Sequence, residues 1–103
     1  MVNSLSTIIV DDEPLARKGL AIRLQAHPDI NIVQLCSNGK EALTAIKNQN
    51  IELMFLDIQM PGLNGFQVIQ EIIDQQLKMP MIIFVTAFDQ YAIKAFEVHA
   101  IDY

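Results

Sequence analysis

Short apolar segments alternate along the chain with longer segments of helical periodicity. The short segments are rich in β-branched or aromatic residues, and we expect a strand at each of them: TIIV (7–10), NIVQLC (31–36), LMFL (53–56) and MIIFV (81–85). Because their hydrophobicity is nearly continuous, both faces of these strands are expected to be buried, as in a parallel sheet. The last residues, AIDY, resemble the opening of another strand.

The first of the longer segments follows Asp12, which is a good N-cap, and has Pro14 near the first helical position. We expect this helix to end by His27, because the residue before a proline disfavours the α region. Four-residue spacing gives it an apolar side made of Ala16, Leu20 and Leu24.

Three further helices are expected, over about 39–48, from about 64–65 onward, and around 89–98. Their expected apolar contacts are Ala42, Leu43 and Ile46 in the second helix, Phe66, Ile69, Ile72 and Ile73 in the third, and Ala92, Ala95 and Phe96 in the fourth. Strands and helices in this rhythm predict an α/β fold, an open parallel sheet with helices on both faces. Ligands of such sheets bind beyond the carboxyl ends of the strands, where the strand order reverses.

Size and charge narrow the function classes. A chain of 103 residues is one domain, and its net charge of −5 argues against binding of nucleic acid or an anionic membrane by this segment itself, while leaving room for a cation. Cys36 is the only cysteine, so no internal disulfide can form, and no apolar segment is long enough to span a bilayer. We therefore expect a cytoplasmic protein with no membrane partner.

Acidic residues stand at the carboxyl ends of two predicted strands. Asp11 and Asp12 follow the first strand, Asp57 follows the third, and Thr86 follows the fourth. Any one of these aspartates alone is more often a helix cap or a turn residue. Three carboxylates at one sheet edge instead favour a divalent cation such as Mg²⁺, bound directly by Asp12 and Asp57, with Asp11 acting mainly through water.

Three segments together carry a family resemblance: IIVDDEP, LMFLDIQMPGLNGFQVI and IIFVTAFDQYAIKAFEVHAIDY. They resemble the receiver domain of bacterial two-component response regulators, and the last segment is most similar to the subgroup with a LytTR-type DNA-binding output. The resemblance spans Ser6 to Tyr103. It implies a flavodoxin-like (CheY-like) doubly wound parallel sheet of strand order 2-1-3-4-5, cut off at the start of the fifth strand.

The resemblance also implies roles for individual residues. Asp57 would be the phosphoacceptor, receiving a phosphoryl group from a sensor histidine kinase or a small phosphodonor. Asp11, Asp12, Asp57 and the backbone carbonyl of Gln59 would bind Mg²⁺ or Mn²⁺. Thr86 would contact the phosphoryl group and act as a switch, and Tyr103 would be the switch aromatic.

The chain departs from the family pattern at its end. The pattern continues about three residues past the aromatic to a lysine that pairs with the phosphoryl group, and then to a further helix, whereas this sequence stops at Tyr103. Residues 1–103 would thus be a C-terminally incomplete receiver without its output domain. We expect metal binding to survive, phosphorylation-driven switching to be impaired, and a homodimer to form through the exposed sheet edge or the face of the fourth helix and fifth strand.

Other functions are weighed against the receiver. A Mg²⁺-dependent aspartyl-phosphate phosphohydrolase would need an acid/base aspartate two residues past the nucleophile, where this chain has Gln59. A receiver-like interaction module that is never phosphorylated agrees with the missing lysine but not with the intact acidic residues. A nucleotide or flavin binder is disfavoured because no glycine-rich loop follows the first strand. DNA would be bound only through an output domain outside this chain.

Overall fold

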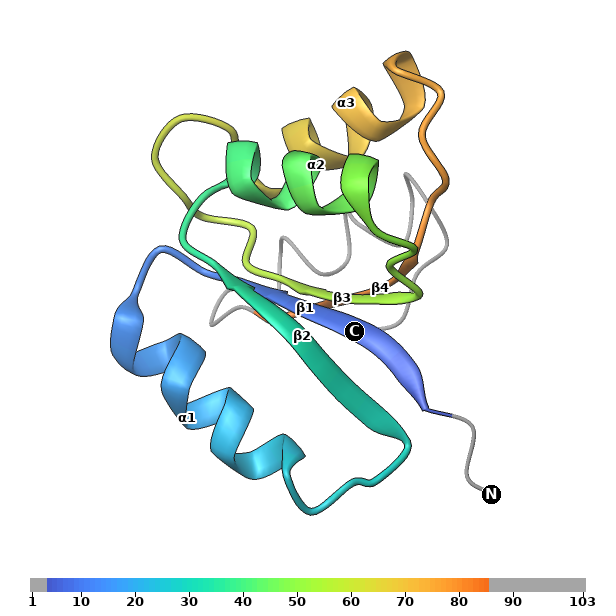
Figure 1. Ribbon diagram of the computed structural model, residues 1–103. Helices are drawn as coiled ribbons and strands as arrows, with labels where there is room; N and C mark the ends of the chain where they lie inside the picture. The colour runs from blue at the N-terminus through green and yellow to red at the C-terminus, as the bar shows by residue number, and fades with distance from the viewer. Residues whose placement is uncertain (1–3, 86–103) are drawn as a thin grey trace.

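The computed structural model describes residues 4–85, which form a parallel sheet flanked by helices (Figure 1). In chain order the elements are β1 (Leu5–Val10), α1 (Pro14–Leu24), β2 (Ile30–Cys36), α2 (Gly39–Asn48), β3 (Leu53–Leu56), α3 (Gly65–Asp74) and β4 (Met81–Phe84). All neighbouring strands pair in parallel in the order β2-β1-β3-β4. This confirms the first four positions of the predicted order, while the expected fourth helix (89–98) and fifth strand lie outside the described residues.

The helices lie on both sides of the sheet, as predicted for a doubly wound fold. Figure 1 shows α2 and α3 over one face and α1 over the other. Side chains of β1 alternate between these faces, so that Ile8 and Val10 join the core under α2 and α3 whereas Ile9 packs in the cluster that includes Leu24 of α1. The core under α2 and α3 is the larger of the two, and Leu15 and Ile22 of α1 remain 83 % and 60 % exposed.

Strand β2 differs from the prediction that both faces of every strand are buried. From Ile30 to Leu35 its residues alternate between half-buried and exposed, with Val33 and Leu35 exposed, and only Cys36 is fully buried. The reason is its place at the end of the strand order, where, within residues 4–85, it pairs with β1 alone. The pairing register shifts between Thr7 and Ile8, which face Ile32 and Gln34, so Val33 is an extra residue on β2, a β-bulge.

Helix α1 is capped differently from the prediction, although it ends where expected. Asp12 was expected to cap it, but the N-cap is Glu13, which makes no side-chain cap bond, and the Glu13 N–H is bound by a carboxylate oxygen of Asp11 at 2.9 Å. The helix ends at Leu24, before the His27-Pro28 pair, where a tight turn takes over. Within its expected apolar side Leu24 is buried and Leu20 half-buried, whereas Ala16 is exposed.

Helix α2 matches its predicted range of 39–48, and α3 begins at the predicted position, because both have strong N-terminal caps. The Asn38 side chain accepts the Glu41 N–H, and Asn64 and Gln67 form a reciprocal capping box. The predicted contacts Ala42, Leu43, Ile46, Ile69 and Ile72 are buried; Phe66 is half-buried and Ile73 is 46 % exposed. Val68, which was not among the predicted contacts, is fully buried.

Among residues 4–85, no helix has both the length and the apolar character needed to cross a membrane.

Candidate functional site

The site lies at the carboxyl edge of the sheet, between the ends of β1 and β3. The chain passes from β1 to β2 on one side and later returns to β3 on the other, so the strand order reverses here. Figure 1 shows the connections that follow β1, β2 and β3 along the same edge of the sheet. Main-chain hydrogen bonds extend the ladder past the strands: the Asp57 N–H donates to the Val10 carbonyl at 2.9 Å, and the Asp11 N–H to the Cys36 carbonyl at 3.1 Å.

These bonds bring the predicted carboxylates together. One oxygen each from Asp11, Asp12 and Asp57 lies within 4.8 Å of the others, and all three residues are half-buried. Oxygens in an octahedral Mg²⁺ shell lie about 2.1 Å from the ion and therefore up to about 4 Å from one another. Small rotations of the three side chains would satisfy this geometry, so the residues fit a hard divalent cation that keeps part of its water shell.

Asp57 has a perturbed acidity. Burial raises the pKa of its carboxyl to about 6 from the ordinary value of 3.8, and the negative charge of Asp11 adds to the rise. The charge of Asp12 acts in the same direction, while a hydrogen bond from the Gln59 N–H opposes it. A carboxylate whose pKa is raised by burial and by like charges is strongly stabilised by a nearby cation.

Asp11 is held at three points. Its main chain is tied to β2 through Cys36, its carboxylate accepts the Glu13 N–H, and its carbonyl accepts a 2.7 Å hydrogen bond from the guanidinium of Arg17. Arg17 is not among the residues that the sequence predicted for the site. In the sequence, an arginine in the first turn of a helix looks the same whether its side chain is solvated or bonded to the protein. The hydrogen bond from Arg17 to the Asp11 carbonyl is visible only in the structure.

The loop after Asp57 packs its backbone tightly against the site. The Gln59 N–H donates to Asp57 Oδ1 at 3.3 Å, and the Gly65 N–H donates to the Ile58 carbonyl at 2.9 Å. A Cβ atom on Gly65 would lie 2.8 Å from the Asp57 carbonyl oxygen and 2.9 Å from the Ile58 Cα, so only glycine fits there. Gly62 has φ +75°, which also favours glycine.

The roles predicted for the remaining site residues are not tested by the part of the chain that the structure describes. Gln59 is exposed beside Asp57, and ligation by its carbonyl remains a prediction. Thr86 and Tyr103 lie outside the described residues. Val85, the last residue described, donates its N–H to the Leu56 carbonyl at 3.0 Å, one residue before Asp57. Cys36, at the end of β2, is fully buried, and burial raises the pKa of its thiol to about 12, so the thiol is unsuited to nucleophilic chemistry.

A parallel sheet of order 2-1-3-4 with an acidic cluster at its switch point defines a class: α/β proteins of the flavodoxin-like, or CheY-like, receiver fold. The family follows from comparison of the sequence. A model of the response regulator receiver domain matches residues 7–103, so the chain belongs to that family of two-component signalling domains.

Relatives with similar sequences are regulatory proteins. The chain is 50 % identical over 99 residues to the transcriptional regulatory protein BtsR of Salmonella typhi, covering 96 % of this chain and 41 % of that protein. It is 41 % identical over 104 residues to an uncharacterized response regulatory protein of Vibrio cholerae, covering 100 % of this chain and 40 % of the relative. The chain thus spans about two-fifths of the length of these curated relatives.

Among solved structures, the response regulatory domain of mrkE from Klebsiella pneumoniae superimposes with a TM-score of 0.82 at 35 % identity, covering 96 % of this chain and 80 % of that one. The response regulator domain of CheB from Thermotoga maritima gives a TM-score of 0.85 at 24 % identity, covering 97 % and 76 %, and supports the fold alone.

Proposed function

We propose that this receiver accepts a phosphoryl group on Asp57, in a Mg²⁺-dependent transfer from a sensor histidine kinase. The observation that carries the proposal is the gathering of Asp11, Asp12 and Asp57, with ligand oxygens within 4.8 Å, at the switch point of the sheet. A purely structural site would hardly collect three half-buried carboxylates, because their repulsion costs free energy unless a cation joins them.

The chain's own groups suit this chemistry. With a pKa of about 6, Asp57 is mostly ionised at neutral pH and is a competent nucleophile. An oxygen of its carboxylate would attack the phosphorus, forming a P–O bond while the P–N bond to the kinase histidine breaks and the electron pair leaves with the imidazole. A bound Mg²⁺ would offset the charge of the carboxylates and of the incoming phosphoryl group. Asp12 and Asp57 would bind the ion with the Gln59 carbonyl, Asp11 mainly through water, and Thr86 would donate its hydroxyl to a phosphoryl oxygen.

The wider role is proposed from the relatives. BtsR is a transcriptional regulatory protein, and this chain is half identical to it over 99 residues. We propose that the parent protein works in the cytoplasm, that a LytTR-type output domain outside this chain binds DNA, and that Tyr103 takes part in passing on the phosphorylated state. Homodimers through the face of the fourth helix and fifth strand would be one way to pass it on.

Intact-mass spectrometry after incubation with acetyl phosphate and Mg²⁺ tests the phosphoacceptor. The unmodified sequence is expected to gain the mass of one phosphoryl group, and Asp57→Asn is expected to gain none. Asp29→Asn is the matched control. Asp29 is an exposed aspartate, and along the chain it lies far from Asp11, Asp12 and Asp57. It should be phosphorylated like the original chain.

The same assay separates the competing functions. A chain that stays unmodified while binding Mg²⁺ would contradict the proposal and favour an interaction module that is never phosphorylated. Continuous release of phosphate from added phosphomonoesters, lost in Asp57→Asn, would favour the phosphohydrolase instead.

A further inference from the structure

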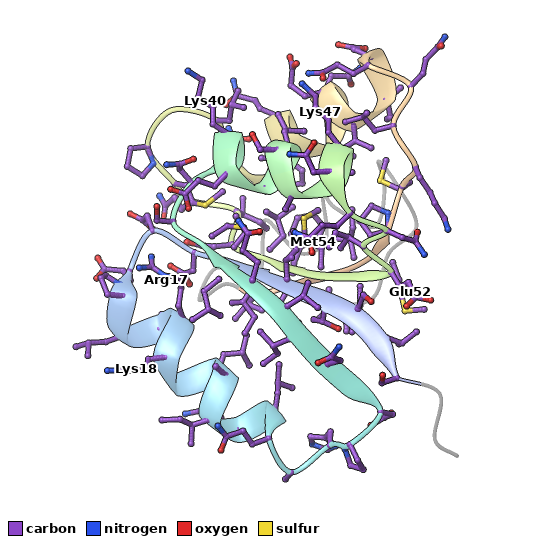
Figure 2. The ribbon with its side chains drawn as sticks, in the orientation of Figure 1. Arg17, Lys18, Lys40, Lys47, Glu52 and Met54 are labelled. Atoms are coloured by element: carbon purple, nitrogen blue, oxygen red, sulfur yellow. The ribbon has the colours of Figure 1, made fainter. Side chains whose placement is uncertain are left out.

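Arg17 is the cationic side chain that the structure ties directly to the acidic turn after β1. It lies in the first turn of α1, where its N–H donates to the Glu13 carbonyl at 3.1 Å. Its guanidinium Nη1 donates to the main-chain carbonyl of Asp11 at 2.7 Å. Figure 2 shows Arg17 near the sheet end of α1, while its neighbour Lys18 points away from the body of the protein.

The contact closes a ring that contains the acidic turn. Asp11 is bonded at its N–H to β2, at its carboxylate to the Glu13 N–H, and at its carbonyl to Arg17. Because the Asp11 carbonyl belongs to the peptide unit that continues into Asp12, holding this oxygen restricts the rotation of that unit. The orientation of both carboxylates toward Asp57 therefore depends on a hydrogen bond from a side chain in α1.

Arg17 also faces the connection between β2 and α2. Two hydrogen bonds from Ser37 lower the pKa of Glu41, and the positive charge of Arg17 contributes in the same direction. That charge also opposes the rise in the pKa of Cys36. Arg17 as a whole is half-buried, and its guanidinium is bonded to the carbonyl that follows β1.

We infer that Arg17 is a positioning residue for the acidic site, setting its affinity for a divalent cation through the Asp11–Asp12 turn. The inference rests on the proposed function and deepens it. Partners outside the coordination shell that orient metal ligands typically change metal affinity by about 10- to 100-fold when removed.

The sign of the effect separates positioning from simple charge. An arginine near a cation site repels the cation, so removing its charge alone would strengthen Mg²⁺ binding. Loss of the hydrogen bond to the Asp11 carbonyl would loosen the turn and weaken binding. For Arg17→Gln, loss of positioning therefore predicts weaker Mg²⁺ binding, whereas loss of Coulomb repulsion predicts tighter binding.

The test is calorimetric titration of the unphosphorylated chain with MgCl₂, with no phosphodonor present. We expect Arg17→Gln to weaken Mg²⁺ binding about 10-fold, and Arg17→Lys to fall between Arg17→Gln and the original chain, because an ammonium group can still donate to the carbonyl. Lys18→Gln removes the same charge from the next residue, which is exposed, and should bind Mg²⁺ as the original chain does.

Unchanged or tighter Mg²⁺ binding in Arg17→Gln would overturn the inference. If Arg17→Gln does not fold, as judged by circular dichroism, unchanged or tighter binding in Arg17→Lys would overturn it. The result is distinguishable from failure of the proposed function: an original chain that is not phosphorylated on Asp57 refutes that function, whereas an original chain that binds Mg²⁺ and is phosphorylated, with Arg17→Gln unaffected, refutes only the role of Arg17.

Discussion

At the scale of single residues, Asp57 carries a cost in stability when it is ionised. Its carboxyl has a pKa of about 6 in the folded chain and 3.8 as its ordinary value, so the folded state holds the proton more tightly than the unfolded state. Stability therefore falls as pH rises from about 4 to about 6, and above that range the whole cost is present. A cation bound beside Asp57 would offset this cost.

This gives a prediction for Asp57→Asn in metal-free buffer. The variant is expected to be more stable than the original chain by about 1 kcal/mol at pH 7.5, a value reduced for solvent screening of a half-buried group. The difference should vanish at pH values well below 3.8, where the Asp57 carboxyl is neutral in both the folded and the unfolded chain. Thermal unfolding followed by circular dichroism would show an increase of about 4–8 °C in Tm at the higher pH. An equal increase in Asp29→Asn would mean that net charge, and not the site, is responsible.

At the scale of elements, two positions between the end of β3 and the start of α3 require glycine. Position 62 requires it because the backbone has a positive φ, and position 65 because a Cβ would collide with the backbone of Asp57 and Ile58. Gly19, in the middle of α1, has nothing within 4 Å of an added Cβ. The chain thus offers a matched pair of glycines in helices, one constrained by packing and one free.

Substitution by alanine is expected to change stability in opposite directions at this pair. Gly65→Ala should destabilise by about 1–3 kcal/mol because the Cβ meets backbone atoms that cannot move aside. Gly19→Ala should stabilise by up to about 1 kcal/mol because alanine is the better helix former. Urea unfolding measures both changes. If Gly65→Ala left the free energy of unfolding unchanged, α3 would be able to shift away from Asp57 without cost, and the tight contact would not matter for stability.

The sequence predicted the elements best where local signals and burial agree. Helices α2 and α3 have asparagine caps and a strong apolar side; α2 matches its predicted range and α3 begins at its predicted position. Helix α1 lies within its predicted segment but lacks the expected Asp12 cap, because the Asp11 carboxylate binds the Glu13 N–H instead. The exposure of Ala16 depends on what packs against α1, which spacing along one helix does not encode.

At the scale of the whole molecule, the acidic site joins segments far apart in the sequence. The convergence of Asp11, Asp12 and Asp57 was predictable because the carboxyl ends of parallel strands share one edge. The contact from Arg17 to the Asp11 carbonyl was not, since it depends on the conformation of the turn that joins β1 to α1. Residue types and strand ends thus predict the acidic cluster, whereas the hydrogen bonds that hold it are visible only in the structure.

Because the proposed ligands follow two different strands of one sheet, we expect Mg²⁺ to stabilise the fold as a whole. A cation that binds only the folded state at about 100 times its Kd adds about 2.7 kcal/mol. We expect Tm to rise with MgCl₂ concentration in the original chain and to rise much less in Asp12→Asn. The same concentrations of a monovalent salt are the control. An equal rise in both proteins would indicate general ionic screening.

The extra residue in β2 has a consequence for self-association. An unpaired outer strand offers a row of backbone donors and acceptors to any other chain, which is a common start of aggregation. At Val33 the bulge interrupts the even spacing of these groups and increases the local twist, so a second straight strand cannot match it over its full length. This side of the molecule is therefore a poor template for strand addition, and copies that meet at high concentration in the cell are not expected to polymerise through β2.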